Sequence, residues 1–310
     1  MEKVDLSVVV LNFNTSTLLS NCIDSLCKNT RDIRFEIIVV DNNSTEKGSL
    51  KLLEEFEEHP KITKIIRNTK NLGFANGNNL GIKSSKGRYI LLLNSDTLIQ
   101  SNVLGEMISW MDKNTNVGLS SCSLLNKDNT VQGSGGYFPT ITRIFAWMLF
   151  IDDIPFVDRL IKPFHPVHGK SPFYKGTVQF NRYRKQDWIT GAFFLMRSKV
   201  IKDVGVLDEN YFMYVEDMDY CFRARKAGWD VVYNPKWSIV HLGGASSNKE
   251  FPILSEFKAM KQFYRKYYSD IEYLLLRVAF KIGSVLRMIL FGILEGKEAS
   301  KSYARAFKEI

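Results

Sequence analysis

Two groups of acids and one histidine have the types and spacing that metal and acid–base chemistry need. Asp96 ends the tripeptide Asn94-Ser95-Asp96, directly after the apolar run YILLL. A carboxylate at the end of such a strand can hold a divalent cation, because Mg²⁺ or Mn²⁺ commonly bridges protein carboxylates and the oxygens of a diphosphate. His241 also ends a β-branched run, and a neutral imidazole there could complete the metal site. The alternatives are an aspartate that caps a turn and a structural histidine.

The other acidic group, Glu216-Asp217-Met218-Asp219, opens a predicted helix that runs on to Gly228. Three acids in four residues suit the positive end of the helix dipole, so N-terminal capping alone could explain them. The preceding stretch, DENYFMYV, is rich in aromatic residues and would bury the start of the helix. Closely set carboxylates in a partly apolar wall repel each other, and one of them can then act as a general base near neutral pH.

The segments that must position these residues alternate between short apolar runs and helical patterns. The strands are predicted at residues 7–11, 36–40, 64–67 and 89–93, and the helices between them at residues 17–28, 49–58 and 74–85. This alternation is typical of a Rossmann-like α/β domain with a parallel sheet. Asn12, Phe13 and Asn14 stand where a dinucleotide-binding domain carries G-x-G-x-x-G, so a dinucleotide site of the usual kind is not expected.

Amide and carboxylate side chains follow all four of these strands. They are Asn12 and Asn14, then Asp41 to Ser44 with Asn43, then Asn68 and Asn71, then Asn94 to Asp96. In open α/β sheets, ligands bind at the carboxyl ends of the strands. Each residue alone could be a turn former or a helix cap. Their joint occurrence predicts one ligand site at this edge of the sheet.

Composition and charge bound the class of protein. The 310 residues are 45% hydrophobic and 24% charged, which predicts a folded chain of enzyme size and excludes disorder as the main state. The net charge of +9 favours an anionic partner such as a nucleotide, a nucleic acid or a lipid surface. The four cysteines form no C-x-x-C pair, which is typical of reduced thiols in a cytosolic protein. The N-terminal apolar run is too short for a signal peptide, so a cytoplasmic location is expected.

The second half of the chain departs from the α/β pattern. Residues 133–187 hold five of the eight prolines and no clean period, which predicts a partly irregular insertion whose aromatic residues pack locally or face a partner. His165 and His168 lie in this insertion, and no role is assigned to them. The α/β pattern resumes at WITGAFFLMR. We expect a catalytic domain over residues 1–250 and a basic helical tail over residues 251–310.

Within the tail, residues 273–294 are apolar enough to suggest a membrane span, but three basic residues interrupt them. At 100° per residue, Arg277, Lys281 and Arg287 share one stripe of a helix. This favours an amphipathic helix that lies on an anionic membrane surface over one that spans it. The alternative is a helix that packs on its own catalytic domain or on a second copy of the chain in a homodimer.

Seven segments, in this order and at this spacing, resemble glycosyltransferase family 2. They are VVVLNFN, EIIVVDNNS, NLGFANGNN, YILLLNSD, WITGAFFLMR, FMYVEDMDYCFRARKAGW and VVYNPKWSIVHLGG. They look closest to the rhamnosyltransferase-like branch and extend over residues 6–247. The resemblance implies a GT-A fold and an inverting, metal-dependent hexosyltransferase that uses a nucleoside diphosphate sugar. Rhamnose from dTDP-rhamnose is the donor expected for this branch, with a UDP-sugar as the alternative.

The resemblance also implies an acceptor, a place in the cell and roles for single residues. The acceptor is a glycan or a polyprenol-linked glycan of surface polysaccharide synthesis, and the enzyme is peripheral at the inner face of the plasma membrane. Asp217 matches the acid that deprotonates the acceptor hydroxyl, while Asp96 and His241 match ligands of Mg²⁺ or Mn²⁺. Asn94 stands in place of the first acid of the D-x-D motif, as is frequent in this branch.

The remaining matched positions bind substrate. Asp41 would bind the pyrimidine ring, and the rest of the nucleotide would contact Asn12, Asn14 and Asn43. The donor would be covered by Asn71, Gly73, Phe74 and Asn78, and its diphosphate would adjoin Asn94 and Ser95. The transferred sugar and the acceptor would border Trp188, Thr190 and Gly191, and the site of the catalytic base would be shaped by Glu216 and Asp219.

Two other functions compete with this one. A nucleotidyltransferase could use the same sheet edge and metal, but it would show a basic, glycine-rich loop early in the chain, and none follows the first strand. A nucleic-acid-binding module would place basic residues at the ligand edge, whereas this edge is acidic and amide-rich. No nucleic-acid partner is therefore expected.

Overall fold

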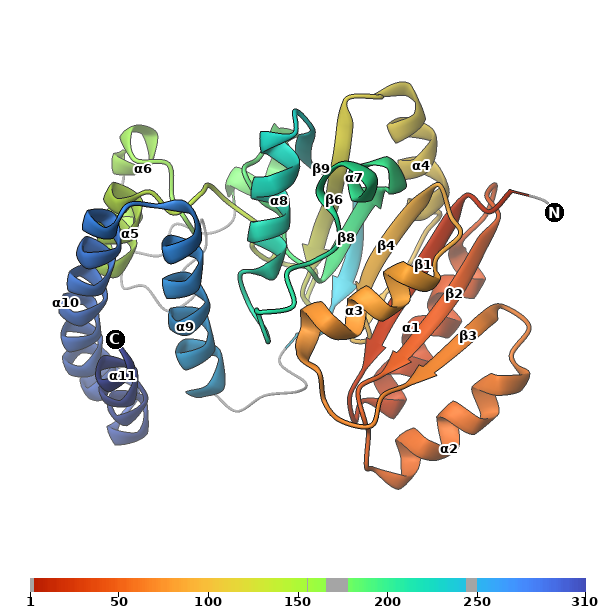
Figure 1. Cartoon of the computed structure of the whole chain (residues 1–310), viewed down its shortest axis with the longest axis horizontal. Coiled ribbons are helices and arrows are strands. Elements are labelled where there is room, and N and C mark those ends of the chain that lie inside the picture. Colours follow the sequence, from red (N-terminus) through yellow and green to blue (C-terminus); the bar gives the residue numbers. More distant parts are fainter. Residues whose placement is uncertain (1–2, 155, 166–177, 244–249) are drawn as a thin grey trace. The chain divides into compact units, whose positions relative to one another are not determined.

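The computed structural model describes residues 3–154, 156–165, 178–243 and 250–310. His168 and the rest of residues 166–177 lie outside the described residues, as do residues 244–249 near the expected domain boundary. The chain divides into two compact units (Figure 1). The first comprises Met1–Ser134, Gln179–Phe212 and Glu216–Ser246, and the second comprises Gly135–Val178, Met213–Val215 and Ser247–Ile310. The domain limits expected from the sequence stay a prediction.

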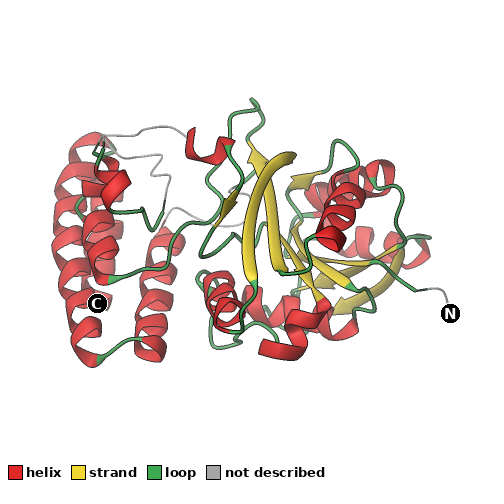
Figure 2. Ribbon diagram, turned by 90° about the horizontal axis from the view of Figure 1, so that it is seen from above, coloured by secondary structure: helices red, strands yellow, loops and turns green. Residues whose placement is uncertain are grey.

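The first unit is a mixed sheet with helices on its faces (Figure 2). Its strands are β1 (Leu6–Asn12), β2 (Phe35–Asp41), β3 (Ile62–Arg67), β4 (Tyr89–Asn94), β5 (Thr97–Leu98), β6 (Val117–Leu125), β7 (Arg184–Lys185), β8 (Phe193–Arg197) and β9 (Asp230–His241). Its helices are α1 (Ser16–Asn29), α2 (Lys47–Glu55), α3 (Gly73–Ser84), α4 (Val103–Lys113), α7 (Ser198–Val204) and α8 (Glu216–Lys226), with short 3₁₀ turns η1 (Phe56–Glu58) and η3 (Val178–Asn181).

The strand order brings the polar strand ends together. It runs β3-β2-β1-β4-β8-β6-β9-β5, and β7 pairs with β9. β3, β2, β1 and β4 are parallel, so their carboxyl ends share one edge. In this register Asn12 pairs with Asp41, and the neighbouring Leu11 pairs with Asn94. The antiparallel pairing of β5 with β9 sets Thr97 opposite His241.

The sequence accounts for these elements directly. The central strands are buried on both faces, which is why they read as continuous apolar runs. In α1, the buried residues Leu19, Cys22, Ile23 and Leu26 follow the helical spacing. The four predicted strands and the helices at 17–28 and 74–85 are confirmed within a few residues. The predicted helix 49–58 ends as an α-helix at Glu55 and continues as η1 to Glu58. His59, which precedes Pro60, is extended and ends the helical segment.

The second unit is helical. It contains α5 (Ile141–Met148), η2 (Ile151–Asp153), α6 (Val157–Leu160), α9 (Glu250–Tyr267), α10 (Asp270–Leu294) and α11 (Lys297–Glu309). Trp147 of the predicted insertion packs edge-on against Phe164 of the insertion itself and against Phe257 of α9 and Phe280 of α10. It therefore packs within the insertion and also against the C-terminal helices. α10 approaches α5 closely at Gly283, where a Cβ atom would lie 2.7 Å from Cβ of Met148.

The three basic residues of α10 contact other parts of this unit, and only Arg287 is buried. Arg287 is buried, and its guanidinium donates to the backbone carbonyls of Trp147 and Met148, at the end of α5. Carbonyls in the last turn of a helix lack partners within the helix, and Arg287 supplies one. Arg277 donates to the carbonyl of Ile310, and the ammonium of Lys281 lies over the ring of Phe307. The expectation that all three residues face a membrane is therefore wrong for Arg287.

The opposite face of α10 is aliphatic and exposed. Nine side chains, spaced three and four residues apart for the most part, have exposed fractions of 37% or more: Ile271, Leu274, Leu275, Val278, Ile282, Val285, Leu286, Ile289 and Ile293. We call these nine residues the α10 stripe. In the part of the chain that the structure describes, no helix has both the length and the apolar character required to cross a bilayer.

Candidate active site

A network of side chains occupies the ends of β1 and β2. Because these strands pair in register, Nδ2 of Asn12 reaches Oδ1 of Asp41 at 2.8 Å. The hydroxyl of Ser44 donates to the same oxygen at 2.6 Å, and the Ser44 N–H donates to Oδ2 at 2.9 Å. Asp41 is buried. A carboxylate has about four acceptor positions, so these three bonds fix Asp41 and leave capacity for one further donor.

The loop that follows β1 extends this network toward Asp96. Asn14 has a positive φ of 54°, which asparagine tolerates better than most residues, and its Oδ1 accepts the N–H groups of Thr45 and Glu46. The hydroxyls of Thr15 and Ser95 lie 2.9 Å apart. Asn43 is exposed, with a φ of 68°. Asn12, Asn14, Asp41 and Ser95 thus belong to one connected group.

Asn42, predicted only as part of the polar strand end Asp41 to Ser44, ties this group to the loop before α3. Its Nδ2 donates to Oδ1 of Asn71 at 3.1 Å and to the carbonyl of Gly73 at 3.0 Å. Its Oδ1 accepts from Nδ2 of Asn68 at 2.9 Å and from the N–H of Leu72 at 3.3 Å. Both ends of this buried amide are therefore used to shape the loop at residues 68–73.

The same loop leads to the second acidic group. Gly73 has a φ of 78°, and a Cβ there would lie 2.2 Å from the carbonyl oxygen of Phe212, to which Phe74 donates its N–H. A Cβ on Gly191 would lie 2.8 Å from Cζ of Phe74. The N–H of Gly191 in turn donates to Oδ2 of Asp217 at 2.8 Å. Both glycines are needed for this close approach, which brings Phe74, Gly191 and Asp217 together.

Asp217 and Glu216 begin α8 in different surroundings. Oδ1 of Asp217 accepts the N–H of Met218 at 2.7 Å, and the helix N-terminus favours a negative charge there. Glu216 is buried, and its Oε2 has no hydrogen-bond partner among the described residues. Burial, together with the charges of Asp217 and Asp219, raises the pKa of Glu216 well above its ordinary value. Burial of Glu216 therefore disfavours its charged form.

Asp219, the third acid, is a buried residue that stabilises the position of α8. It is fully buried and accepts from Nε of Arg223 at 2.8 Å. Arg223 also donates to the carbonyls of Val204, the last residue of α7, and of Val206 just beyond it. Asp219 therefore acts on the position of the helix through Arg223.

Asp96 and His241 meet across the β5–β9 pair. Oδ1 of Asp96 lies 3.4 Å from Nε2 of His241, and the N–H of Leu242 donates to the Asp96 carbonyl. Both side chains retain some exposure, 12% for Asp96 and 17% for His241. A carboxylate oxygen is a suitable donor for Mg²⁺ or Mn²⁺, and a neutral imidazole nitrogen suits a transition metal such as Mn²⁺ better than Mg²⁺. Among the described residues, no group of three or more potential ligands is placed to hold a metal, so a cation would also need oxygens from substrate or water.

The other predicted residues surround these groups. Nδ2 of Asn78 donates to the carbonyl of Phe74 at 2.9 Å. The N–H of Asn94 donates to the carbonyl of Ala192, which brings the end of β4 beside Gly191. Trp188 is buried and Thr190 half-buried, in the segment just before Gly191.

The sequence predicted Asn42 and Ser44 only as members of the polar segment Asp41 to Ser44 after β2 and gave neither a role of its own. Gln132, which contacts His241, is 109 residues away from it in the chain, and no sequence signal connects the two.

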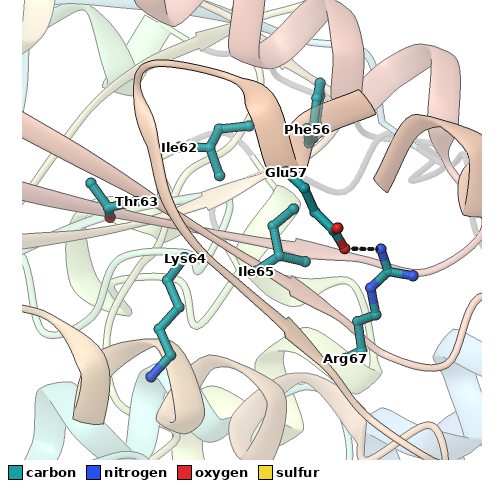
Figure 3. A pocket seen from close by; sticks show the side chains of 7 residues that line it. All are labelled: Phe56, Glu57, Ile62, Thr63, Lys64, Ile65 and Arg67. Carbon is teal, nitrogen blue, oxygen red and sulfur yellow. Dashed lines mark hydrogen bonds and ion pairs between the residues drawn. The ribbon is translucent and has the colours of Figure 1, made fainter. Parts of the chain in front are cut away.

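A hollow of about 460 Å³ lies elsewhere, between η1 and β3 (Figure 3). Seven residues line it, with Glu57 and Arg67 joined by an ion pair at 2.6 Å: Phe56, Glu57, Ile62, Thr63, Lys64, Ile65 and Arg67. None of the predicted site residues is among them, so it is separate from the strand-end site.

Comparison with known families decides how this site is classified. Residues 7–205, well over half of the chain, match the family described as Glycosyl transferase family 2. The chain belongs to glycosyl transferase family 2. This finding confirms the resemblance seen in its motifs.

Relatives in this family differ greatly in length. The O-antigen biosynthesis protein RfbC of Myxococcus xanthus is 28% identical over 77% of this chain, but the match covers only 17% of RfbC. The rhamnosyltransferase WbbL of Escherichia coli is 25% identical over 76% of this chain and 82% of WbbL. The chain thus spans less than a fifth of the first relative and most of the second.

A solved structure shows the fold. The crystal structure of GalNAc-T7 with UDP, GalNAc and Mn²⁺ superposes with a TM-score of 0.61 at 14% identity, covering 99% of this chain and 56% of the other. At this identity the likeness concerns the fold alone. The family 2 chain has the GT-A fold that its motifs predicted.

Proposed function

We propose that this chain is an inverting glycosyltransferase that moves a sugar from a nucleoside diphosphate to a hydroxyl of a glycan or polyprenol-linked acceptor. The observation that carries the proposal is the position of Asp217. Its carboxylate is held by the N–H groups of Gly191 and Met218 and adjoins the loop that contains Phe74. Membership of family 2 supports the same reaction class.

Asp217 acts as the general base. It takes the proton of the acceptor hydroxyl while the acceptor oxygen bonds to the anomeric carbon. The bond from that carbon to the diphosphate oxygen breaks, and the nucleoside diphosphate leaves. Direct displacement inverts the anomeric centre and needs no covalent enzyme intermediate. Burial raises the pKa of Glu216 and so disfavours a second negative charge beside the base.

The strand-end network binds the nucleotide. Asp41 accepts from a pyrimidine N–H through its remaining acceptor capacity, and Asn12, Asn14 and Asn43 line the nucleotide pocket. The loop held by Asn42 presents Asn71, Gly73 and Phe74 to the donor. We propose rhamnose from dTDP-rhamnose as the donor, supported by the name of WbbL, and synthesis of a surface polysaccharide, supported by the name of RfbC. A UDP-sugar is the alternative donor.

Asp96 and His241 would hold Mg²⁺ or Mn²⁺, which would neutralise charge on the leaving diphosphate. The Mn²⁺ and UDP in the GalNAc-T7 structure support this use of a metal. Asn94 and Ser95 adjoin the same position. Their short polar side chains suit contact with phosphate oxygens.

A cytoplasmic enzyme at the inner face of the plasma membrane fits the α10 stripe. The stripe gathers nine exposed aliphatic side chains on one face of a helix, and contiguous apolar surface of this kind marks an interaction site. The same unit exposes basic residues that suit anionic lipid headgroups: Lys258, Arg265, Lys266, Lys281, Lys297, Lys301, Arg305 and Lys308. A lipid surface would cover the stripe and bring the enzyme to a polyprenol-linked acceptor. The competing occupant is the same helix of a second copy in a homodimer.

Screening of nucleotide sugars tests the reaction. Slow hydrolysis of dTDP-rhamnose, faster with Mn²⁺ than without it, is expected, and UDP-sugars form the comparison set. Hydrolysis of none of these donors, or release of pyrophosphate from a nucleoside triphosphate and a sugar phosphate, would overturn the proposal in favour of another use of the sheet edge.

A further inference from the structure

Gln132 lies behind the imidazole of His241. It follows β6 through a short turn, and its own N–H donates to the carbonyl of Leu124, which fixes its backbone. Its side-chain amide makes three hydrogen bonds of 2.7 Å. Nε2 of Gln132 donates to the carbonyl of His241 and to Oδ1 of Asn126, while Oε1 faces Nδ1 of His241. One side chain therefore binds both the backbone and the ring of His241.

These contacts determine which ring nitrogen carries the proton. A backbone carbonyl can only accept, so the atom of Gln132 next to the His241 carbonyl must be the NH₂ group. The other end of the amide is then the carbonyl oxygen Oε1, which also can only accept. Nδ1 of His241 must therefore carry the hydrogen that joins it to Gln132. In the neutral ring, the lone pair is on Nε2.

A second acceptor lies close to that nitrogen. Nε2 lies 3.4 Å from Oδ1 of Asp96, a carboxylate oxygen that also offers lone pairs. A cation bound by both groups would use the lone pairs of both.

We infer that Gln132 is a positioning residue for the cation site: it fixes the Nδ1–H tautomer and the ring orientation of His241, so that Nε2 is offered to a divalent cation together with Asp96. The cation rests on the proposed function, whereas the tautomer rests on the hydrogen bonds alone. Partners of this kind, which act through a ligating histidine, typically change metal affinity by about 10-fold to 100-fold.

Nitrogen NMR of the imidazoles tests the tautomer without metal or activity. Spectra of ¹⁵N-histidine-labelled protein at alkaline pH, where imidazole is neutral, distinguish Nδ1–H from Nε2–H. The chain has four histidines, and the spectrum of His241→Asn identifies the signals of His241. Wild type should show the Nδ1–H form. Gln132→Met has a similar shape without hydrogen bonds, and it should give a mixture of both forms.

Asn126→Ala is the matched control, since it removes one bond of the same amide but leaves the bond to Nδ1. It should keep the Nδ1–H form. Mn²⁺ titration in the presence of dTDP, followed by electron paramagnetic resonance, should show affinity about 10-fold to 100-fold weaker for Gln132→Met than for Asn126→Ala. Circular dichroism establishes that each variant is folded.

The outcomes separate this inference from the proposed function. An Nε2–H ring in wild type, or an unchanged Nδ1–H ring in Gln132→Met, would overturn the role of Gln132. A tautomer that shifts as expected with equal Mn²⁺ affinities would overturn the link from tautomer to cation. If wild type has the Nδ1–H form and binds no Mn²⁺ with dTDP, the metal in the proposed function is wrong and the control of the ring by Gln132 stands.

Discussion

The backbone N–H of Gly191 donates to Oδ2 of Asp217 at 2.8 Å. With the Met218 N–H on Oδ1, this bond holds both oxygens of the carboxylate from the protein side. Gly191 can approach so closely only because it lacks a Cβ, which would meet the ring of Phe74. The orientation of the proposed base thus depends on a residue with no side chain of its own.

Removing the charge of Asp217 should stop transfer. Asp217→Asn keeps the size of the side chain but has no basic oxygen, so the rate should fall by about 10² to 10⁴ while nucleotide binding persists. Transfer rate and nucleotide affinity are measured on the same preparation. Asp24→Asn, an exposed change on α1, is the control and should leave both unchanged. More than half of the wild-type rate in Asp217→Asn, with a verified acceptor, would rule out this base.

The two members of the Asp96–His241 pair should differ in their effect on metal-dependent binding. Asp96→Ala removes the charged oxygen ligand and should weaken Mn²⁺-dependent dTDP binding more than His241→Ala, which removes a neutral one. Calorimetric titration of dTDP with and without Mn²⁺ measures both effects. Equal dTDP affinity of the wild type in the two conditions would remove the metal from the mechanism.

Glu216 should make stability depend on pH. Because burial raises its pKa in the folded protein, the folded state binds this proton more tightly than the unfolded chain does. The destabilisation of the folded state by Glu216 is absent below the pKa of this group in the unfolded chain, about 4.3. It grows as the pH rises toward the pKa in the folded protein, by about 1.4 kcal/mol for each pH unit between the two values. Glu216→Gln should therefore melt at a higher temperature than wild type at neutral pH.

The comparison is made as a series of melting curves from about pH 4 to pH 8. The difference in melting temperature between Glu216→Gln and wild type should widen as the pH rises. If this difference stays constant over the whole range, Glu216 ionises normally. Glu54→Gln, an exposed change on α2, controls for the loss of a carboxyl group in general.

Charges in the α10 stripe should release the enzyme from lipid. Ile282 and Ile289 are 48% and 62% exposed, and glutamate favours helix, so replacing both by Glu should preserve the fold. Sedimentation with anionic vesicles should show binding by wild type and little by this double variant. Leu160→Glu alters an equally apolar, 87% exposed residue outside the stripe and should bind as wild type does.

Mass measurement without lipid distinguishes the other occupant of the stripe. Wild type should have the mass of one chain, 35.7 kDa. A mass of two chains that the double variant halves, together with unchanged vesicle sedimentation, would assign the stripe to a homodimer. Changing Arg287 would not make this distinction, because its guanidinium holds the end of α5.

Local pattern predicted the parts of the structure that depend on nearby residues. Runs such as VVVL have no polar position for solvent, so they predict buried strands. Asn12 and Asp41 then meet because parallel strands end at one edge. The orientation of α10 could not be predicted in this way. Spacing shows that Arg287 and Ile289 lie on different faces of a helix, but which face packs inward depends on the carbonyls of Trp147 and Met148, far away in sequence. The contact between Gln132 and His241 has the same non-local origin.

Asn42 has a consequence for how the nucleotide binds. All four of its hydrogen bonds are made within the chain, so the loop before α3 acquires its shape during folding. A loop that is already ordered loses little conformational entropy when a ligand arrives. The end of β2, which would hold the base, and the loop that would cover the donor therefore behave as one preformed surface. Nucleotide association should then proceed in a single kinetic phase, with a rate set by encounter rather than by loop rearrangement.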